Sequence, residues 1–504
     1  MWLLLLSACA STPTDSADTA AAVDTADSSD TADTGGPAAL DVGGVAEMTT
    51  EPGQVTVTVA NAGDYLVALV SLDDKQGRSY AYGDAVAEAA HAPDDPPDLL
   101  PAVPTGDTPK VAAFAEGDER TFSVHNGTTY VDITAKATRV TDALVLWEDQ
   151  TTPNEIGTLD QSVIDGVAEN VESLILPRER LLFGQESDVD GDPRVQLLLS
   201  YTVNQYGAVA YVTQCDIGRT AGCGGTGNDG EIVYLGIPDP DGNYRTIDGV
   251  SETVAHEWNH LIYGWHRFVD QDRAGADENI YITEGMSALA QDLTGYNNGN
   301  QYVWAAAIVE NSALGPNSGV DFVSVNDFLR GEGYYDEDRD GTLRGASYLF
   351  LRYLFEQAGG MSVEPDGTQV DEGGMAFLHA WFDSGALGAD TVEDVTGKGL
   401  DETVMDWYTA LVCTGLVETG DPRFSYQPRE ADPITGYEYG VDPYDTIHDW
   451  LTLDGPPIQK LARADGSIRA GGVEYLSVSL DAGETFTLPV EDRASARARI
   501  IRVK

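Results

Sequence analysis

The 504-residue sequence is poor in basic residues, cysteine and histidine, and each shortage limits what the protein can do. It holds 28 Lys and Arg against 84 Asp and Glu, a formal net charge of −56. Such a chain repels phosphate groups, so we exclude nucleic acid as a partner. No internal stretch reaches the ~18 apolar residues that a membrane-spanning helix needs. With 42% hydrophobic residues, the chain can nevertheless build real cores, and its length suggests about three domains.

The four cysteines indicate an exported protein rather than a metal-binding knuckle. Cys215 and Cys223 bracket a short Gly-rich loop and are expected to form a local disulfide. Cys413 lies in an apolar helical pattern, which predicts a buried free thiol. The Gly-rich residues 222–230 lack the Gly-Lys-Ser/Thr ending of a phosphate-binding loop, so a nucleotide site is not expected there.

The N-terminus resembles the end of a bacterial lipoprotein signal. Residues 6–9 read Leu-Ser-Ala-Cys, which is similar to a lipobox, and Cys9 would carry the lipid. The alternative is an ordinary signal peptide cleaved nearby, and both versions mean export to the cell envelope or the medium. We expect a signal over 1–9 and a disordered Asp/Thr/Ala-rich tether over 10–40, so the lipid is the one expected membrane contact.

Hydrophobic periodicity divides the remainder into three regions of an α+β protein. Residues 41–150 alternate with period two and contain Asn126-Gly127, a hairpin-type turn, which predicts an N-terminal β-domain resembling a small sandwich. Residues 151–440 mix short strands with apolar helices and are expected to form the metal-binding domain. Residues 456–504 return to period two and predict a C-terminal β-module.

The start of the central region is expected to contain one helix and then a sheet. The helical pattern over 160–176 should stop at Pro177, because proline lacks the amide hydrogen of the next helical turn. Three strand-like runs follow, at Val195–Leu199, Ala208–Val212 and Glu231–Leu235. A mixed sheet followed by a metal-binding helix is the order of a zincin-type catalytic domain.

The organising motif is His-Glu-Trp-Asn-His at residues 256–260, a His-Glu-x-x-His pattern. On a helix, His256 and His260 share one face with Cβ atoms roughly 5–6 Å apart, which suits one metal ion. Glu257 is turned by about 100° and suits a water molecule beside that metal. With only 7 histidines in 504 residues, a chance match is improbable. The motif predicts a zinc site with Glu257 as general base.

Two residues compete to be the third metal ligand. His266 follows His256 by ten residues, as in metzincins, but it can reach the metal only if the helix breaks near Gly264. Glu284 opens a second helical pattern, and Gly285 beside it leaves room for a metal. We favour Glu284, which is the gluzincin arrangement, and keep His266 as the alternative.

Three stretches resemble the hyicolysin-type gluzincin metallopeptidases: 256–263, 284–290 and 344–354, within about 120–420 of this chain. The resemblance implies zinc bound by His256, His260 and Glu284, with Glu257 catalytic. It implies an exported endopeptidase that acts on proteins or peptides, and we expect a monomer. The 23 residues between His260 and Glu284 slightly exceed the thermolysin-like spacing.

Such enzymes usually add a Tyr or His that stabilises the oxyanion. Tyr348 is the first candidate here and His379 the second, although for both a packed helical residue is the more common identity.

Two further interpretations stay open. The acidic loops Asp188–Asp192 and Asp336–Asp340 have the alternating carboxylates of calcium sites, but neither has the Glu that completes an EF-hand, so structural Ca²⁺ and solvated turns are equally expected. The rival function is a catalytically silent surface adhesion or binding protein on a zincin fold, against which the intact Glu257 argues.

Overall fold

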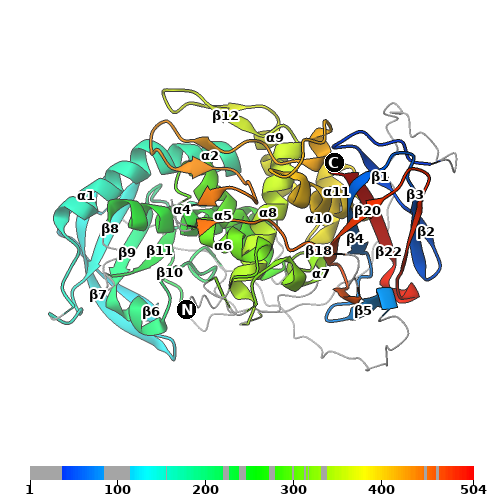
Figure 1. Ribbon diagram of the computed structural model, residues 1–504. Coiled ribbons are helices and arrows are strands. Elements are labelled where there is room, and N and C mark those ends of the chain that lie inside the picture. Colours follow the sequence, from blue (N-terminus) through cyan, green and yellow to red (C-terminus); the bar gives the residue numbers. More distant parts are fainter. Residues whose placement is uncertain are drawn as a thin grey trace.

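The protein is an α+β structure, seen in a computed structural model that describes most of the chain (Figure 1). The described residues are 37–84, 114–154, 156–218, 226–237, 246–271, 278–297, 300–311, 314–315, 317–330, 336, 338–447, 451–460 and 465–504. The expected signal and nearly all of the expected tether therefore lie outside the described residues. Among the described helices, none is both long and apolar enough to cross a membrane.

A six-stranded mixed sheet forms one end of the molecule. Its strand order is β10-β11-β9-β8-β7-β6, with β8, β9 and β11 parallel and the outer strands antiparallel. The strands are β6 (Glu119–His125), β7 (Tyr130–Val140), β8 (Leu144–Asp149), β9 (Val195–Ser200), β10 (Ala210–Tyr211) and β11 (Ile232–Gly236). The predicted Asn126-Gly127 turn joins β6 to β7, with Gly127 at φ 89°.

Most of the helices fill the middle of the molecule between this sheet and a second β-region (Figure 1). The helices are α1 (Gln161–Asn170) and α3 (Tyr201–Tyr206), which contact the sheet, and α2 (Leu176–Phe183), α4 (Ile247–Gly264), α5 (Ile280–Thr294), α6 (Asn300–Ile308), α7 (Val325–Phe328), α8 (Asp340–Gln357), α9 (Gly374–Asp383), α10 (Ala389–Thr396) and α11 (Leu400–Cys413). A short hairpin of β12 (Met361–Val363) with β13 (Gln369–Asp371) connects α8 to α9. Two more hairpins follow α11, formed by β14 (Glu430–Ala431) with β15 (Glu438–Tyr439) and by β16 (Thr446–Ile447) with β17 (Leu451–Thr452).

The first helix does not stop at Pro177, contrary to the prediction. A π-helical turn, η2 (Val171–Ile175), links α1 directly to α2, and Pro177 lies in the first turn of α2. Pro177 has no amide hydrogen to continue an α-helical ladder, and directly before it the amide of Leu176 donates to the carbonyl oxygen of Val171, five residues earlier, as in a π turn. The wider π turn lets the helix continue past the proline. Val171 and Ile175 of this turn stay buried.

The β-rich ends of the chain do not form the two separate modules that we expected. The strands near both termini pair into one module, which has its own core. Its main sheet is β1 (Val45–Glu47), β22 (Ala496–Arg502), β4 (Gly63–Ser71), β20 (Val473–Leu480) and β18 (Gln459–Lys460), in that order. A second sheet is β2 (Thr49–Glu51), β3 (Gln54–Thr58) and β21 (Thr485–Pro489), and β5 (Ser79–Tyr82) pairs with β19 (Gly466–Arg469).

The expected boundary near residue 150 also differs from the sheet boundaries. Strands β6, β7 and β8 lie before that point, but they belong to the six-stranded sheet. Period-two patterns identify strands without saying which strands pair, because both edges of a β-strand offer the same backbone groups. The central α+β region accordingly spans about 114–447 of the described chain rather than 151–440.

The two cysteines within the described residues differ in state, one bonded and one free. Cys215 is disulfide-bonded, while Cys223 lies outside the described residues. Cys413 ends α11 as a buried free thiol.

Buried Glu474 of β20 gives the terminal module a predicted pH dependence. Its Oε2 accepts hydrogen bonds from Tyr82 Oη and Gln459 Nε2, both at 3.2 Å, and burial raises the pKa of Glu474 to about 8. Between the unfolded pKa of about 4.3 and this value the folded state holds the extra proton, so stability falls as the pH rises. We expect Glu474→Gln to raise the free energy of unfolding by on the order of 2 kcal/mol at pH 8 and little at pH 4.

Denaturant unfolding at the two pH values measures this difference. Glu484→Gln, an exposed site in the same module, is the control. An equal effect of Glu474→Gln at both pH values would contradict the assignment.

Candidate metal centre

Helix α4 carries the His-Glu-x-x-His motif. Thr246 caps its start by accepting a hydrogen bond from the amide of Gly249 at 3.0 Å. The apolar stripe that includes Val254, Trp258 and Ile262 is fully buried, which fixes the rotation of the helix. His256 and His260 thereby face away from that core and toward α5.

Helix α5 brings Glu284 to the two histidines. Asn279 caps the helix through a hydrogen bond from the amide of Tyr281 at 2.9 Å. The amide group of Asn279 also donates to the carbonyl oxygens of Asp327 and Arg330, both at 3.0 Å. These bonds fix the start of α5, and Glu284 lies in its second turn, where α4 and α5 contact each other.

Among the described residues, His256, His260 and Glu284 are the one group of three side chains placed so that they could hold a metal ion. The Nε2 atoms of His256 and His260 are 3.2 Å apart. Glu284 Oε2 is 3.2 Å from His256 Nε2, and Glu284 Oε1 is 3.6 Å from His260 Nε2. Bonds of about 2.0–2.1 Å at tetrahedral angles would separate ligand atoms by roughly 3.3 Å. These spacings fit three protein ligands on one tetrahedral zinc ion.

Unpartnered buried atoms also fit a cation at this point. Glu284 Oε1 and Glu257 Oε2 are buried oxygens without a hydrogen-bond partner. Buried carboxylate oxygens are rarely left unsatisfied, because the loss of water costs free energy that a hydrogen bond or a cation must offset. The donor set of two imidazoles and one carboxylate is the set that zinc hydrolases use.

Gln291 orients the imidazole of His256. The Nδ1 atom of His256 lies 3.0 Å from Oε1 of Gln291, which lies about two turns after Glu284 on α5. With its proton on Nδ1 donated to Gln291, the imidazole leaves the lone pair of Nε2 for a metal.

Arg344 of α8 completes the electrostatics of the group. Its guanidinium contacts Glu284 Oε2 and also binds both carboxylate oxygens of Asp340, at 2.9 and 3.0 Å. Burial alone would raise the pKa of Glu284, but Arg344 and the two imidazoles outweigh it and hold the pKa well below its usual range. Glu284 is therefore ionised, as a metal ligand must be.

Glu257 differs from Glu284 in the direction in which its surroundings shift its pKa. Its side chain is buried, and burial raises its pKa although the imidazoles of His260 and His256 partly oppose this. A carboxylate with a raised pKa is a better proton acceptor near neutral pH than an exposed one.

His266 does not join the metal-ligating group. The helix does not break at Gly264 but continues as a π-helical turn, η3 (Trp265–Asp270), which turns the His266 ring away. Its Nε2 lies 2.9 Å from the carbonyl oxygen of Gln185. The alternative third ligand is thus a half-buried packing residue beside α2.

Neither expected oxyanion-stabilising residue lies at the group. Tyr348 is fully buried and donates its hydroxyl to Asp292 Oδ2 at 2.8 Å. His379 lies in α9 with its Nε2 2.9 Å from the carbonyl oxygen of Leu181. Tyr348 is therefore a buried packing residue, and His379 is an exposed residue of α9.

Sequence reasoning missed Arg344, and it misread Gly285. A Cβ atom on Gly285 would lie 2.3 Å from Ser347 Oγ, so this glycine makes room for α8 rather than for a metal. The available signal for Arg344 was its position, since a basic residue in the strongly apolar stretch 343–355 demands a buried acidic partner.

Asp192, Asp336 and Asp340 of the two acidic loops bind arginine side chains, and the expected structural Ca²⁺ stays a prediction. Arg194 binds both oxygens of Asp192, at 2.7 and 2.6 Å. Arg339 binds Asp336, and Arg344 binds Asp340. No group of three metal-ligating side chains forms at either loop among the residues that the structure describes.

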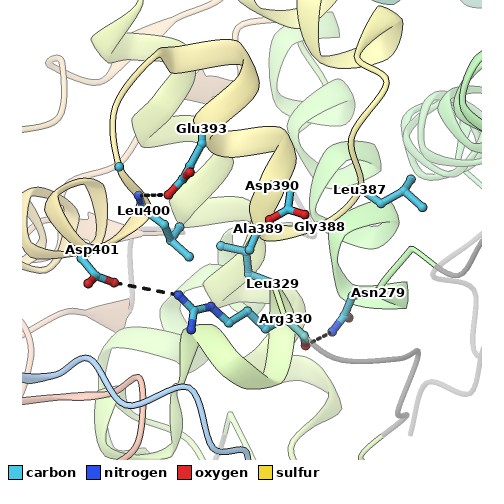
Figure 2. Close-up of a pocket in the computed structure, with 11 residues that line it drawn as sticks. Asn279, Leu329, Arg330, Leu387, Gly388, Ala389, Asp390, Glu393, Leu400 and Asp401 are labelled. Carbon is cyan, nitrogen blue, oxygen red and sulfur yellow. Dashed lines mark hydrogen bonds and ion pairs between the residues drawn. The ribbon is translucent and has the colours of Figure 1, made fainter. Parts of the chain in front are cut away.

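A separate cavity of about 490 Å³ lies beside the start of α5 (Figure 2). Asn279, Arg330 and Asp390 are among its lining residues, and Arg330 lies 3.9 Å from Asp401. None of the three metal-ligating residues lines it, so the cavity is distinct from the candidate metal centre.

No protein-family model and no curated protein matches this chain.

The third ligand can be tested directly. We expect the wild type to bind roughly one zinc ion per chain. His266→Ala should keep that ion, because His266 faces Gln185, whereas Glu284→Ala should lose most of it during dialysis. Metal analysis of the dialysed variants measures both, and loss of zinc from His266→Ala with retention in Glu284→Ala would reverse the assignment.

Proposed function

We propose that this chain is a zinc-dependent endopeptidase built on a zincin-type domain of the gluzincin arrangement. The observation that carries the proposal is the tetrahedral spacing of His256, His260 and Glu284. The resemblance to hyicolysin-type enzymes points the same way. The catalytic region would be 114–447, because β6, β7 and β8 complete its sheet.

The three ligating residues would hold the metal, and Glu257 would move the proton. When bound to His256, His260 and Glu284, zinc supplies Lewis acidity, lowering the pKa of water to about 7 and polarising a carbonyl group. Glu257 accepts a proton from the attacking water as the C–O bond forms. Glu257 then donates that proton to the amide nitrogen as the C–N bond breaks, so the amine leaves neutral.

The edge of the six-stranded sheet favours a peptide substrate over a small ester or amide. Strand β10 is the outermost strand of that sheet and contacts the metal-binding helix α4. Among the described strands it pairs with β11 alone. An edge strand offers free backbone groups to which an extended peptide can add.

Export remains part of the proposal. The disulfide at Cys215 is typical of oxidising compartments outside the cytosol, which agrees with a signal before Cys9.

The test is Glu257→Gln. The variant should keep zinc, because Glu257 is not one of the three ligating residues, while kcat/KM for casein-derived peptides should fall by about 10²–10⁴-fold with the loss of the base. Zinc analysis and a fluorogenic peptide assay measure the two effects. Glu169→Gln, at an exposed site on α1, is the matched control.

Three outcomes matter. Hydrolysis by the wild type and the control alone supports the proposal. Undiminished hydrolysis by Glu257→Gln contradicts the mechanism. Zinc in every variant without hydrolysis in any would favour a silent binding protein.

A further inference from the structure

Arg344 connects a proposed metal ligand to a second carboxylate. The Arg344 side chain is 12% exposed and comes from the first turns of α8, where it contacts Glu284 Oε2 from α5. Its Nε atom donates to Asp340, one turn earlier on α8. The guanidinium thus bridges two carboxylates, which its planar fork of donors suits better than an ammonium group does.

The contact exists because α5 and α8 approach closely at Gly285. A side chain there would meet Ser347 at 2.3 Å from its Oγ and at 2.8 Å from its carbonyl carbon. Ser347 lies one turn after Arg344, so the closest approach of the two helices coincides with the Arg344–Glu284 pair.

The two oxygens of Glu284 are therefore unequal. Oε2 is shared between Arg344 and the Nε2 side of His256, whereas Oε1 is buried without a hydrogen-bond partner. Because the Arg344 guanidinium holds one oxygen of Glu284, the carboxylate cannot rotate freely. The same edge of the carboxylate therefore stays turned toward the histidines.

We propose that Arg344, anchored by Asp340, is a positioning residue that presents Glu284 to the metal as a one-oxygen ligand. The inference rests on the proposed function, since it assumes a metal at His256 and His260. It assigns to α8 the role of setting the coordination number of a site whose ligands come from α4 and α5.

A second ion pair on the same two helices provides an internal control. Arg352 and Asp292 lie eight residues after Arg344 and Glu284 respectively, and they are 2.6 Å apart. Arg352 also binds Glu356, which repeats the bridge between two carboxylates. The side chains of Arg352 and Asp292 are 3% and 0% exposed, so this pair is buried at least as deeply but contacts no proposed ligand.

The experiment compares Arg344→Lys with Arg352→Lys in the full chain. Both variants keep the positive charge and lose the planar guanidinium group that can bind two carboxylates at once. Competition with a chromogenic chelator measures the affinity for zinc, and the visible absorption of the Co²⁺-loaded protein reports the coordination number. Arg344→Lys should weaken zinc binding by about 10–100-fold and change the Co²⁺ spectrum, because support of a metal ligand is lost. Arg352→Lys should lower the unfolding temperature and leave both metal readouts as in the wild type.

Asp340→Asn tests the anchor separately, and it keeps the inference testable if Arg344→Lys does not fold. It loosens Arg344 without touching Glu284, so it should shift both metal readouts in the same direction by a smaller factor. Wild-type zinc affinity and an unchanged Co²⁺ spectrum in Arg344→Lys and Asp340→Asn would overturn this inference alone. Failure of the wild type to bind zinc would overturn the proposed function as well.

Discussion

The burial of Glu284 is the constraint on which the central helices depend. Its side chain is 1% exposed, and an ionised carboxylate at that depth costs several kcal/mol unless opposite charges and hydrogen bonds offset the loss of water. The offset comes from Arg344 on α8 and from the two histidines on α4. The ionised carboxylate of Glu284 can therefore stay buried only when α4, α5 and α8 are all packed together. The packing of each of these helices thus depends on the other two.

The packing around Glu284 leaves little freedom. Gly285 permits the contact of α5 with Ser347, and a side chain at Gly345 would lie 2.1 Å from the carbonyl oxygen of Val303, so α8 is held closely on two sides. At the far end of α4, buried Arg267 and Glu278 form an ion pair at 3.0 Å that ties η3 to the start of α5. A site held by rigid elements at several points keeps its geometry without a bound ligand.

Local sequence rules predicted the local part of this arrangement. The spacing of His256 and His260 follows from helical geometry, and the strands around 195–235 follow from short apolar runs. The strand partners did not follow, because β4 pairs with strands several hundred residues away and the period-two pattern carries no information on partners.

The misses within the site have a similar cause. Arg344 and Glu284 are 60 residues apart, and their contact depends on how α8 lies against α5. The expected role of Tyr348 failed because Asp292, whose buried carboxylate needs donors, lies opposite it on α5. The interpretation of Pro177 failed because a helix can widen by one π turn, which sequence propensity does not express.

The interleaved terminal module has a consequence for how the chain is made. Strand β4, whose residues from Tyr65 to Val70 are all buried, lies between β20 and β22. Synthesis begins at the N-terminus, so β4 emerges early and both of its neighbours emerge last. The central α+β region can collapse in the meantime, and the module closes against α11 as a late step. A chain that stops before residue 473 would carry an apolar strand with both edges open, which is a template for aggregation with other chains.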